Sequence, residues 1–288
     1  MSSQIAISGV GFRKWSGRIV FYTALGLLAV PFVVPTLWML SSSFKPIAQV
    51  LEFPPAFIPR APTLSAYLDV FTLQPFAHQY WNSLYIAVLS TLGTMVVASM
   101  AGYAFARIQF PGARFLFPVV LLGLFVPSEV VVLPIFQILG KVGLLDNHLP
   151  IILMSIMGAP GVVGIFIMRQ YFITFPLELE EAGSLDGLSR FGTFRRIAVP
   201  LARAPLSAVA ITAFLASWNM YIEPLVLLFS KENFTLPIAL AQYVDVTGEP
   251  IWNVQMAAAS LTVIPVLIVF AFAQRSMVEG LAQTGLKG

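Results

Sequence analysis

The sequence predicts an all-α integral membrane protein with six transmembrane helices, both termini in the cytoplasm, and a helical cytoplasmic loop between the fourth and fifth spans. Three observations lead to this fold class. The mean hydropathy of +0.86, with 58% hydrophobic and 10% charged residues, lies far outside the range of soluble domains of 288 residues. Six apolar runs are long enough to cross roughly 30 Å of hydrocarbon. The cationic residues are unequally divided between the two sides of the membrane that these runs define.

The first predicted span covers residues 19–41 and follows Arg13, Lys14 and Arg18. A cleaved signal peptide also has a basic start and an apolar run, but this run is longer than a signal peptide needs and no small-residue cleavage site follows it, which favours a membrane anchor. The proline-rich residues 44–79 come next and are too polar for lipid. They predict an extracytoplasmic loop with one short helix around residues 64–71.

The remaining predicted spans cover residues 81–104, 115–139, 149–172, 204–228 and 254–273, and are followed by a tail from 274 to 288. The third span contains prolines, and the fourth contains Gly158, Gly161 and Gly164 at every third position. A bilayer tolerates broken helices only where neighbouring helices or water satisfy the freed backbone groups. These residues therefore indicate kinked, closely packed helices around a pathway rather than a simple bundle of anchors.

The positive charges give the orientation. All Lys and Arg residues fall on the side of the termini, Lys287 of the tail included, except Lys45, Arg60, Lys141 and Lys231. An excess of cations marks the cytoplasmic side, so both termini and residues 173–203 are predicted to be cytoplasmic. The formal net charge of +3 is too small to suggest nucleic-acid binding, and the absence of cysteine excludes disulfides and Cys-ligated metal sites.

The predicted cytoplasmic loop has the pattern of two short helices with a tight bend. Pro176 suits a first helical turn, and three glutamates follow it near the positive end of the helix dipole. Gly187 suits a helix stop, and a second helix is expected from Ser189 until Pro200. Phe191, Phe194 and Ile197 would share one face of that second helix. Periodicity leaves open whether this face packs on the protein's own spans, on lipid or on a partner.

The same loop carries a recognisable motif. Glu181-Ala182-Gly183, then Asp186-Gly187, then Phe194, Ile197, Pro200 and Pro205, resemble the EAA loop of the membrane subunits of binding-protein-dependent ABC importers. Gly183, Leu188 and Val199 depart from that pattern. The resemblance covers nearly the whole chain. Within the family, the chain is similar to the carbohydrate-uptake branch, and in particular to the second permease of maltose-type systems. The segments "SSSFKP", "VPSEVVVLPIF" and "WNMYIEPL" also resemble that branch.

The resemblance implies a multi-pass subunit of a bacterial or archaeal cytoplasmic (inner) membrane. Its implied partners are a second, homologous permease, two ABC ATPase subunits that bind ATP and Mg, and an extracytoplasmic substrate-binding protein. The residues implied in coupling to the ATPase are Glu181, Ala182, Gly183, Asp186, Gly187, Phe194, Ile197 and Pro200. The sequence lacks a phosphate-binding G-x-x-x-x-G-K-[ST] loop, so this chain is expected to be non-catalytic and to bind no cofactor. The solute could be a sugar, an oligosaccharide or a sugar-like polyol phosphate.

Polar residues inside predicted spans are candidates for the substrate pathway, because such residues are costly in a bilayer. They are Asn82, Ser83, Glu129, Trp218, Asn219 and Glu223. Alternatively, either glutamate could lie at the outer interface or hydrogen-bond to the partner permease. Trp218 could stack on a sugar ring or belong to an interfacial aromatic belt.

Two alternative functional classes remain. An ion-coupled secondary carrier could use Glu129 and Glu223 as proton sites. An intramembrane enzyme is poorly supported, because G-x-S-x-G and H-E-x-x-H are absent. His78 and His148 have no second ligand at metal-binding spacing and are predicted to be solvated loop residues, with no metal site.

Overall fold

The computed structural model describes residues 8–285, and helices dominate this part of the chain, as the predicted all-α class requires. Lys287, which was counted for the orientation, lies outside the described residues. The longer elements are α1 (Ser8–Ser43), α3 (Ser65–Leu73), α4 (Phe76–Arg107), α5 (Ala113–Leu122), α6 (Ser128–Lys141), α7 (His148–Met157), α8 (Ala159–Ile173), α9 (Leu177–Leu185), α12 (Arg203–Trp218) and α15 (Trp252–Gly285). The shorter elements are α2 (Ile47–Val50), η1 (Gly123–Phe125), α10 (Arg190–Thr193), η2 (Phe194–Ala198), α11 (Val199–Leu201), α13 (Ile222–Leu227), η3 (Lys231–Asn233) and α14 (Leu236–Ala241).

The described chain divides into two compact units. One contains residues up to 70 together with 245–260, and the other contains residues 71–244 and those from 261 onward. In the first unit, every side chain of α1 from residue 18 to residue 37 is exposed. A helix of this length with apolar side chains on all sides is suited to a lipid environment or to contact with another chain.

The first unit is held together by polar contacts beyond the end of α1. Lys45 is fully buried, its Nζ donates to the carbonyl oxygen of Ala56 at 2.6 Å, and it lies 4.1 Å from the ring centre of Trp38. Burial lowers the pKa of the Lys45 ammonium, because desolvation disfavours its charged form. The Tyr67 hydroxyl lies 2.9 Å from the Ser43 hydroxyl and 3.0 Å from that of Ser260, and so connects α3 to α1 and α15.

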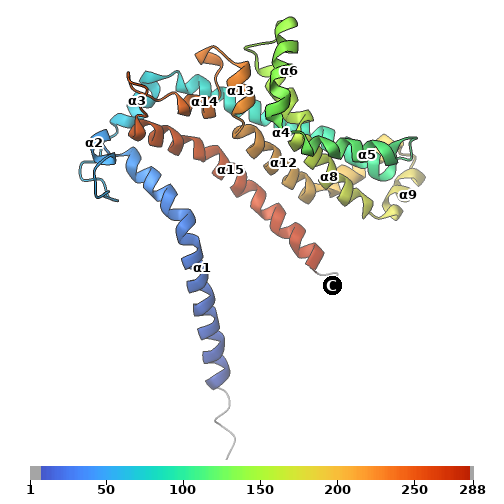
Figure 1. The fold of residues 1–288 in the computed structure, drawn as a ribbon. Helices are drawn as coiled ribbons and strands as arrows, with labels where there is room; N and C mark the ends of the chain where they lie inside the picture. The colour runs from blue at the N-terminus through green and yellow to red at the C-terminus, as the bar shows by residue number, and fades with distance from the viewer. Residues whose placement is uncertain (1–7, 286–288) are drawn as a thin grey trace, which may run out of the picture. The chain divides into compact units, whose positions relative to one another are not determined.

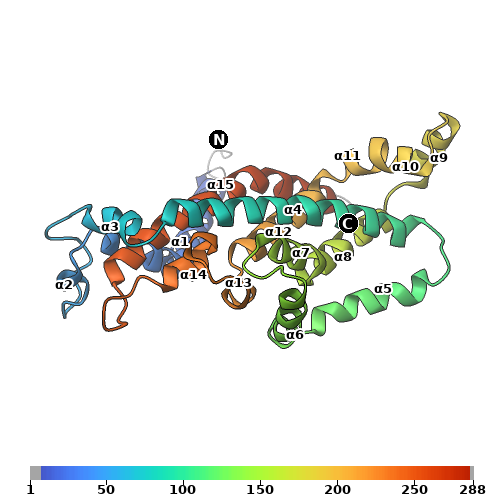
Figure 2. The ribbon, with the colours of Figure 1, turned by 90° about the horizontal axis from the view of Figure 1, so that it is seen from above.

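The second unit is built on α4, which packs along α8 and α12 (Figures 1 and 2). Two glycines allow the helices to approach closely. A Cβ added at Gly102 of α4 would lie 2.6 Å from the Cβ of Met168, and one added at Gly164 of α8 would lie 2.9 Å from the Cβ of Ala98. Larger residues at either position would push the helices apart, so the predicted packing role of Gly164 is confirmed.

Six spans require two bent helix pairs to be counted as spans. Four helical stretches of the described residues are long and apolar enough to cross a bilayer: 18–43, 76–107, 148–173 and 252–272. In the third predicted span, the segments Ala113–Phe125 and Ser128–Lys141 meet at a bend of 97°. A second pair, Arg190–Leu201 and Arg203–Trp218, meets at 79°. Counting each pair as one span gives up to six.

Two predicted spans are not continuous helices. Residues 115–139 are divided at Val126 and Pro127, because a proline disfavours the helical conformation of the preceding residue, and Val126 is extended with ψ 111°. Residues 204–228 are divided after Trp218, where α12 ends, and α13 follows from Ile222. Pro224 cannot donate a backbone hydrogen bond to an earlier turn, which explains why α12 does not continue through this segment.

The fourth predicted span also contains a break, as its glycines indicated. Gly158 separates α7 from α8 with an extended backbone, ψ −160°, and Pro160 occupies the first turn of α8. Proline is well suited to this position, since its missing N–H would have no partner in a first turn.

Candidate functional site: the loop between α8 and α12

The loop between α8 and α12 is folded throughout. It contains α9, α10, the π-helical turn η2 and α11. Figure 2 shows these elements at the end of the second unit where α4 also ends. The loop is therefore an ordered helical projection, built on the helices that form the centre of this unit.

The bend between α9 and α10 follows from Gly187. Its φ of +79° lies in the left-handed region that glycine adopts without strain. The N–H of Leu188 donates to the carbonyl of Gly183 at 2.9 Å, and the N–H of Gly187 donates to that of Ser184 at 3.0 Å, which is the Schellman pattern of a helix end. The Ser189 hydroxyl then accepts from the N–H of Gly192 at 3.1 Å and caps α10. The predicted helix stop and restart are both present.

The second helical run ends within one residue of its predicted end at Pro200. It passes through η2 and α11 and ends at Leu201. Since helix ends vary by one or two residues with the criterion, the end expected at Pro200 agrees with the structure. Pro200 itself is exposed.

Gly183 lets α9 pack against η2. It is buried, and a Cβ added there would lie 2.8 Å from Cδ1 of Ile197 and 3.2 Å from Oγ1 of Thr193. Gly183, which departs from the family pattern, therefore leaves the space that Ile197 occupies in this chain. The two halves of the projection support each other through this contact.

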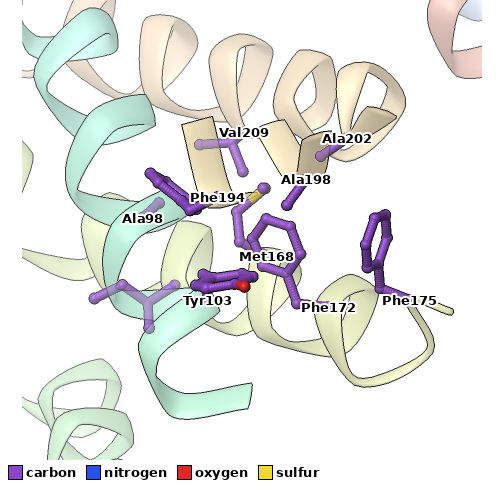
Figure 3. Close-up of a cluster of buried hydrophobic side chains, with 10 residues drawn as sticks. Ala98, Tyr103, Met168, Phe172, Phe175, Phe194, Ala198, Ala202 and Val209 are labelled. Carbon is purple, nitrogen blue, oxygen red and sulfur yellow. The ribbon is translucent and has the colours of Figure 1, made fainter. Parts of the chain in front are cut away.

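Phe194 anchors the projection to the membrane helices. Its ring is only 8% exposed and lies 5.1 Å from the ring of Tyr103 in α4 and 6.5 Å from that of Phe172 in α8. Figure 3 shows it in a cluster with Ala98, Met168, Phe175, Ala198, Ala202 and Val209. Phe194 thus faces its own chain and supports the projection from within. Phe191, which was expected on the same face, is 61% exposed.

An ion pair makes a second attachment. Nε of Arg107, at the end of α4, lies 3.2 Å from Oε1 of Glu180 in α9, and the two side chains are only 11% and 20% exposed. Arg107 also donates to the carbonyl of Phe175, just before α9. Sequence reasoning missed this pair. The available signal was an arginine at the end of the second span and an acidic helix, both predicted on the same side of the membrane.

The outer surface of the projection carries polar residues and several large apolar side chains. Glu181, Ala182, Asp186 and Gly187 of the predicted coupling set are all exposed. The exposed large apolar residues are Leu177, Leu179, Leu185, Phe191 and Leu201, of which Leu185 is the most exposed at 89%. Leu185 was missed as a candidate, although it stands in sequence between Glu181 and Asp186.

Asn82 and Ser83 are predicted pathway residues, but their side chains form hydrogen bonds that fix residues 232–236 of the second unit. Nδ2 of Asn82 donates to the carbonyls of Glu232 at 2.6 Å and Phe234 at 3.2 Å, and the Ser83 hydroxyl accepts from the N–H of Leu236 at 2.7 Å. Both side chains are buried. One face of α4 is therefore committed to residues 232–236.

The other pathway candidates make no hydrogen bond or ion pair with one another in the described part of the chain. Glu129 is exposed in the first turn of α6, and Glu223 is half-buried in the first turn of α13. Asn219 is exposed, and its amide donates to the carbonyl of Leu215 in its own helix. Trp218 is buried and stacks on Phe214, with ring centres 5.6 Å apart. Neither glutamate is enclosed within this chain.

Asp146 organises a second polar network that the sequence did not reveal. Its carboxylate accepts from the N–H groups of Phe229 at 2.9 Å and Ser230 at 3.1 Å, and from the Ser230 hydroxyl. Although desolvation alone would raise the pKa of Asp146, these donors lower it to about 2. The backbone carbonyl of Asp146 also accepts from the Asn233 amide at 3.0 Å.

His148 belongs to the same network. Its ring nitrogens contact the Tyr85 hydroxyl and, at 2.6 Å, the carbonyl of Asn233. The prediction of a solvated loop residue is wrong for His148, because it is half-buried at the start of α7. His78 is exposed, in the first turn of α4. Within residues 8–285, no three His, Asp or Glu side chains gather as a metal site would require.

Comparisons with known proteins agree with this architecture. Residues 95–282, which include the whole projection, match the family described as "Binding-protein-dependent transport system inner membrane component". An arabinooligosaccharides transport system permease protein, AraQ of Halalkalibacterium halodurans, is 34% identical over 96% of this chain and 99% of its own length. A lactose transport system permease protein, LacG of Rhizobium radiobacter, is 32% identical over 93% of this chain and 96% of its own length.

A solved structure shares the fold. It is the crystal structure of a bacterial ABC transporter involved in the import of the acidic polysaccharide alginate, and one of its chains has a TM-score of 0.77 and 24% identity. The similarity covers 95% of this chain and 99% of that one. The motif in the loop, the family match and the relatives agree, and the chain belongs to the family of inner-membrane components of binding-protein-dependent transport systems.

Proposed function

We propose that this chain is one of two membrane subunits of an ATP-driven importer, and that it translocates a carbohydrate or sugar-like solute delivered by an extracytoplasmic binding protein. The names of the relatives, which refer to arabinooligosaccharides and lactose, support the carbohydrate class. The observation that carries the proposal is the ordered projection between α8 and α12. It exposes Glu181, Leu185 and Asp186 while attaching its base to α4 and α8.

The projection has the properties of a coupling element. Movement of a partner can be transmitted only through a part that is stiff and firmly joined to the membrane helices. Here the capped bend at Gly187, the buried Phe194 and the Arg107–Glu180 ion pair provide that stiffness. In the proposed mechanism, ATP closes the two ATPase subunits, the projection follows, and the spans change between inward-facing and outward-facing states.

The remaining partners follow from the same assignment. ATP and Mg belong to the ATPase subunits, and this chain carries out no hydrolysis and binds no cofactor. The exposed apolar side chains of α1 from 18 to 37 are covered by lipid and by the second, homologous permease. The protein is placed in a cytoplasmic (inner) membrane, with the termini and the projection on the cytoplasmic side.

The substrate pathway is proposed to pass near Glu129, Asn219 and Glu223, which lie at the ends of broken helices. Backbone broken at membrane depth is tolerated where it lines a water-filled cavity or contacts protein. Trp218, Asn82 and Ser83 are buried in this chain and are expected to influence the shape of the pathway without lining it.

The test is to purify the complex with its ATPase subunits and to measure ATPase activity with and without the binding protein. Glu181→Lys and Gly187→Asp are expected to lose the ATPase subunits, or to abolish stimulation by the binding protein, while remaining folded in the membrane. Glu178→Lys is the matched control, because Glu178 is also an exposed acidic residue of α9 but lies outside the motif. If no ATPase accompanies the wild type, the proposal fails.

An ion-coupled carrier would behave differently. Its uptake would stop when the proton gradient is collapsed while cellular ATP is maintained, whereas uptake by the proposed importer would continue. The exposed position of Glu129 does not favour a buried proton site within this chain.

A further inference from the structure

The second unit contains a cavity of about 850 Å³ beside the base of the projection. It lies among the end of α4, the connection to α5, the first turns of α5, and parts of α8 and α9. Three arginines line it, Arg107, Arg114 and Arg169, and the only carboxylate among its lining residues is that of Glu180. The cavity therefore carries an excess of positive charge.

The three arginines are not equally occupied. Arg107 is paired with Glu180 and donates to the carbonyl of Phe175. Arg169 lies with its guanidinium 4.1 Å over the ring of Phe117, and its Nε atom is buried without a hydrogen-bond partner. No ion pair to Arg114 or Arg169 is present in the described part of the chain. Two guanidinium groups thus remain available in the cavity.

Their chemistry suits a phosphate. The planar guanidinium group offers paired N–H donors that match two oxygens of a phosphate or carboxylate. The cavity is also lined by Gly112 and Ala113, where the ten-residue helix α5 begins. Several N–H groups of this first turn already donate to the carbonyls of Phe110 and Gly112, so the helix start contributes mainly through its dipole.

The rest of the cavity is apolar, which distinguishes a phospholipid from a free phosphate. Phe105, Phe117 and Pro118 form part of its lining. A ligand with a phosphate at one end and a hydrocarbon chain at the other could contact the arginines and this apolar lining together.

We propose that this cavity binds an anionic phospholipid, with Arg114 and Arg169 contacting the phosphate and the acyl chain lying along α5. The assignment rests on the orientation of the proposed function, which places the cavity at the cytoplasmic end of the spans. Basic pockets between helices on that side of a membrane are known to bind acidic headgroups. Bound lipid would lie directly beside the Arg107–Glu180 ion pair at the base of the projection.

The test measures lipid binding directly. The purified complex in detergent, or the chain alone if no ATPase co-purifies, is freed of lipid and titrated with phosphatidylglycerol, phosphatidylcholine or inorganic phosphate. Bound molecules are counted by native mass spectrometry. The wild type is expected to retain one phosphatidylglycerol, and Arg114→Gln/Arg169→Gln is expected to bind it about thirtyfold more weakly. Arg203→Gln, an exposed arginine on the same predicted side but outside the cavity, should bind like the wild type.

Three results would overturn the proposal. They are equal retention of phosphatidylglycerol by the double variant, equal retention of phosphatidylcholine by the wild type, and displacement of the lipid by an equal concentration of inorganic phosphate, which would assign the cavity to a free anion. Unchanged melting of the double variant in phosphatidylcholine shows that its fold is intact. Should it melt earlier, the single variant Arg114→Gln serves in its place, since Arg114 is exposed and forms no ion pair within residues 8–285. Because the readout is lipid binding, the result does not depend on ATPase coupling.

Discussion

Arg107 and Glu180 come from different predicted segments, the second span and the cytoplasmic loop, and their side chains meet at 3.2 Å with little exposure to solvent. The pair ties the first helix of the projection to the end of the longest helix in the second unit. A largely buried charge that loses its partner is left without compensation, so an ion pair of this kind matters most when one member is removed.

Glu180→Gln is expected to destabilise the protein by about 2 kcal/mol and to reduce binding-protein-stimulated ATPase activity of the complex. The amide keeps the shape of the side chain but leaves the Arg107 guanidinium without a counter-ion. The measurement is thermal unfolding in detergent together with ATPase assays. Glu178→Gln, exposed on the same helix, is the control and should be close to wild type. Equal behaviour of the two variants would show that the ion pair has no structural role.

Gly187→Ala is expected to cost about 1–2 kcal/mol locally, because φ of +79° is unfavourable for any residue with a Cβ. No atom lies within 4 Å of a Cβ added at Gly187, so the cost comes from the backbone and not from a clash. Gly187→Asn should be milder, since Asn tolerates this region better. Limited proteolysis of the loop and ATPase stimulation report the effect.

The control for that series lies in the same loop. Gly192 has no left-handed backbone, and a Cβ added there would make ordinary contacts at 3.4 Å or more. Gly192→Ala should therefore leave both proteolysis and stimulation unchanged. If Gly187→Ala were as well tolerated as Gly192→Ala, the bend would not depend on the conformation of Gly187.

Asn82→Leu is expected to lower stability by about 1–3 kcal/mol, because it removes the donor to the carbonyls of Glu232 and Phe234. This result separates a structural role from a direct role in the pathway. A structural residue changes the unfolding temperature and affects transport of every solute alike. A residue that contacts solute would instead change the KM of transport with an unaltered unfolding temperature, and that outcome would contradict the expectation.

The Asp146 network predicts a pH dependence. Its pKa is lowered from 3.8 to about 2 in the folded protein, so the folded state binds fewer protons than the unfolded state in that range. The resulting stabilisation is present above about pH 4 and is lost as the pH falls towards 2. It amounts to about 1 kcal/mol, once solvent screening at this partly exposed site is allowed for.

Asp146→Asn tests this prediction through unfolding temperatures measured from pH 7 down to pH 2.5. The variant should melt earlier than the wild type at pH 7, and the difference should shrink as the pH approaches 2.5. A constant difference at every pH would mean that the carboxylate charge is not what stabilises the network.

Local rules of chain geometry explain what could be predicted. Gly187 and Ser189 were found because helix ends depend on a few adjacent residues. The apolar runs were found because lipid requires long stretches without charge. The break after Trp218 was missed, because Pro224 lies within a uniformly apolar run and composition alone does not show where a helix in such a run is interrupted.

Long-range pairing explains what was missed. The burial of Phe194 depends on Tyr103 and Phe172, and the position of His148 depends on Tyr85 and Asn233. None of these partners is close in sequence, and no periodicity indicates them. Glu181 and Asp186 are exposed, but the most exposed apolar side chain of the projection, that of Leu185, was overlooked because amphipathic patterns do not mark single apolar residues.

The right-angled corner between η1 and α6 restricts where lipid can be. At Val126 and Pro127 the helical hydrogen bonding stops, and in the first turn of α6 the N–H of Val130 donates to the carbonyl of Pro127 at 3.2 Å, whereas those of Ser128 and Glu129 have no preceding helical carbonyl to pair with. Hydrocarbon offers no substitute partner, so acyl chains cannot cover this corner at membrane depth. With the bent pair counted as one span, the corner is therefore expected to face water or protein. This would place it on the boundary between the lipid-facing and the sheltered surfaces of the subunit.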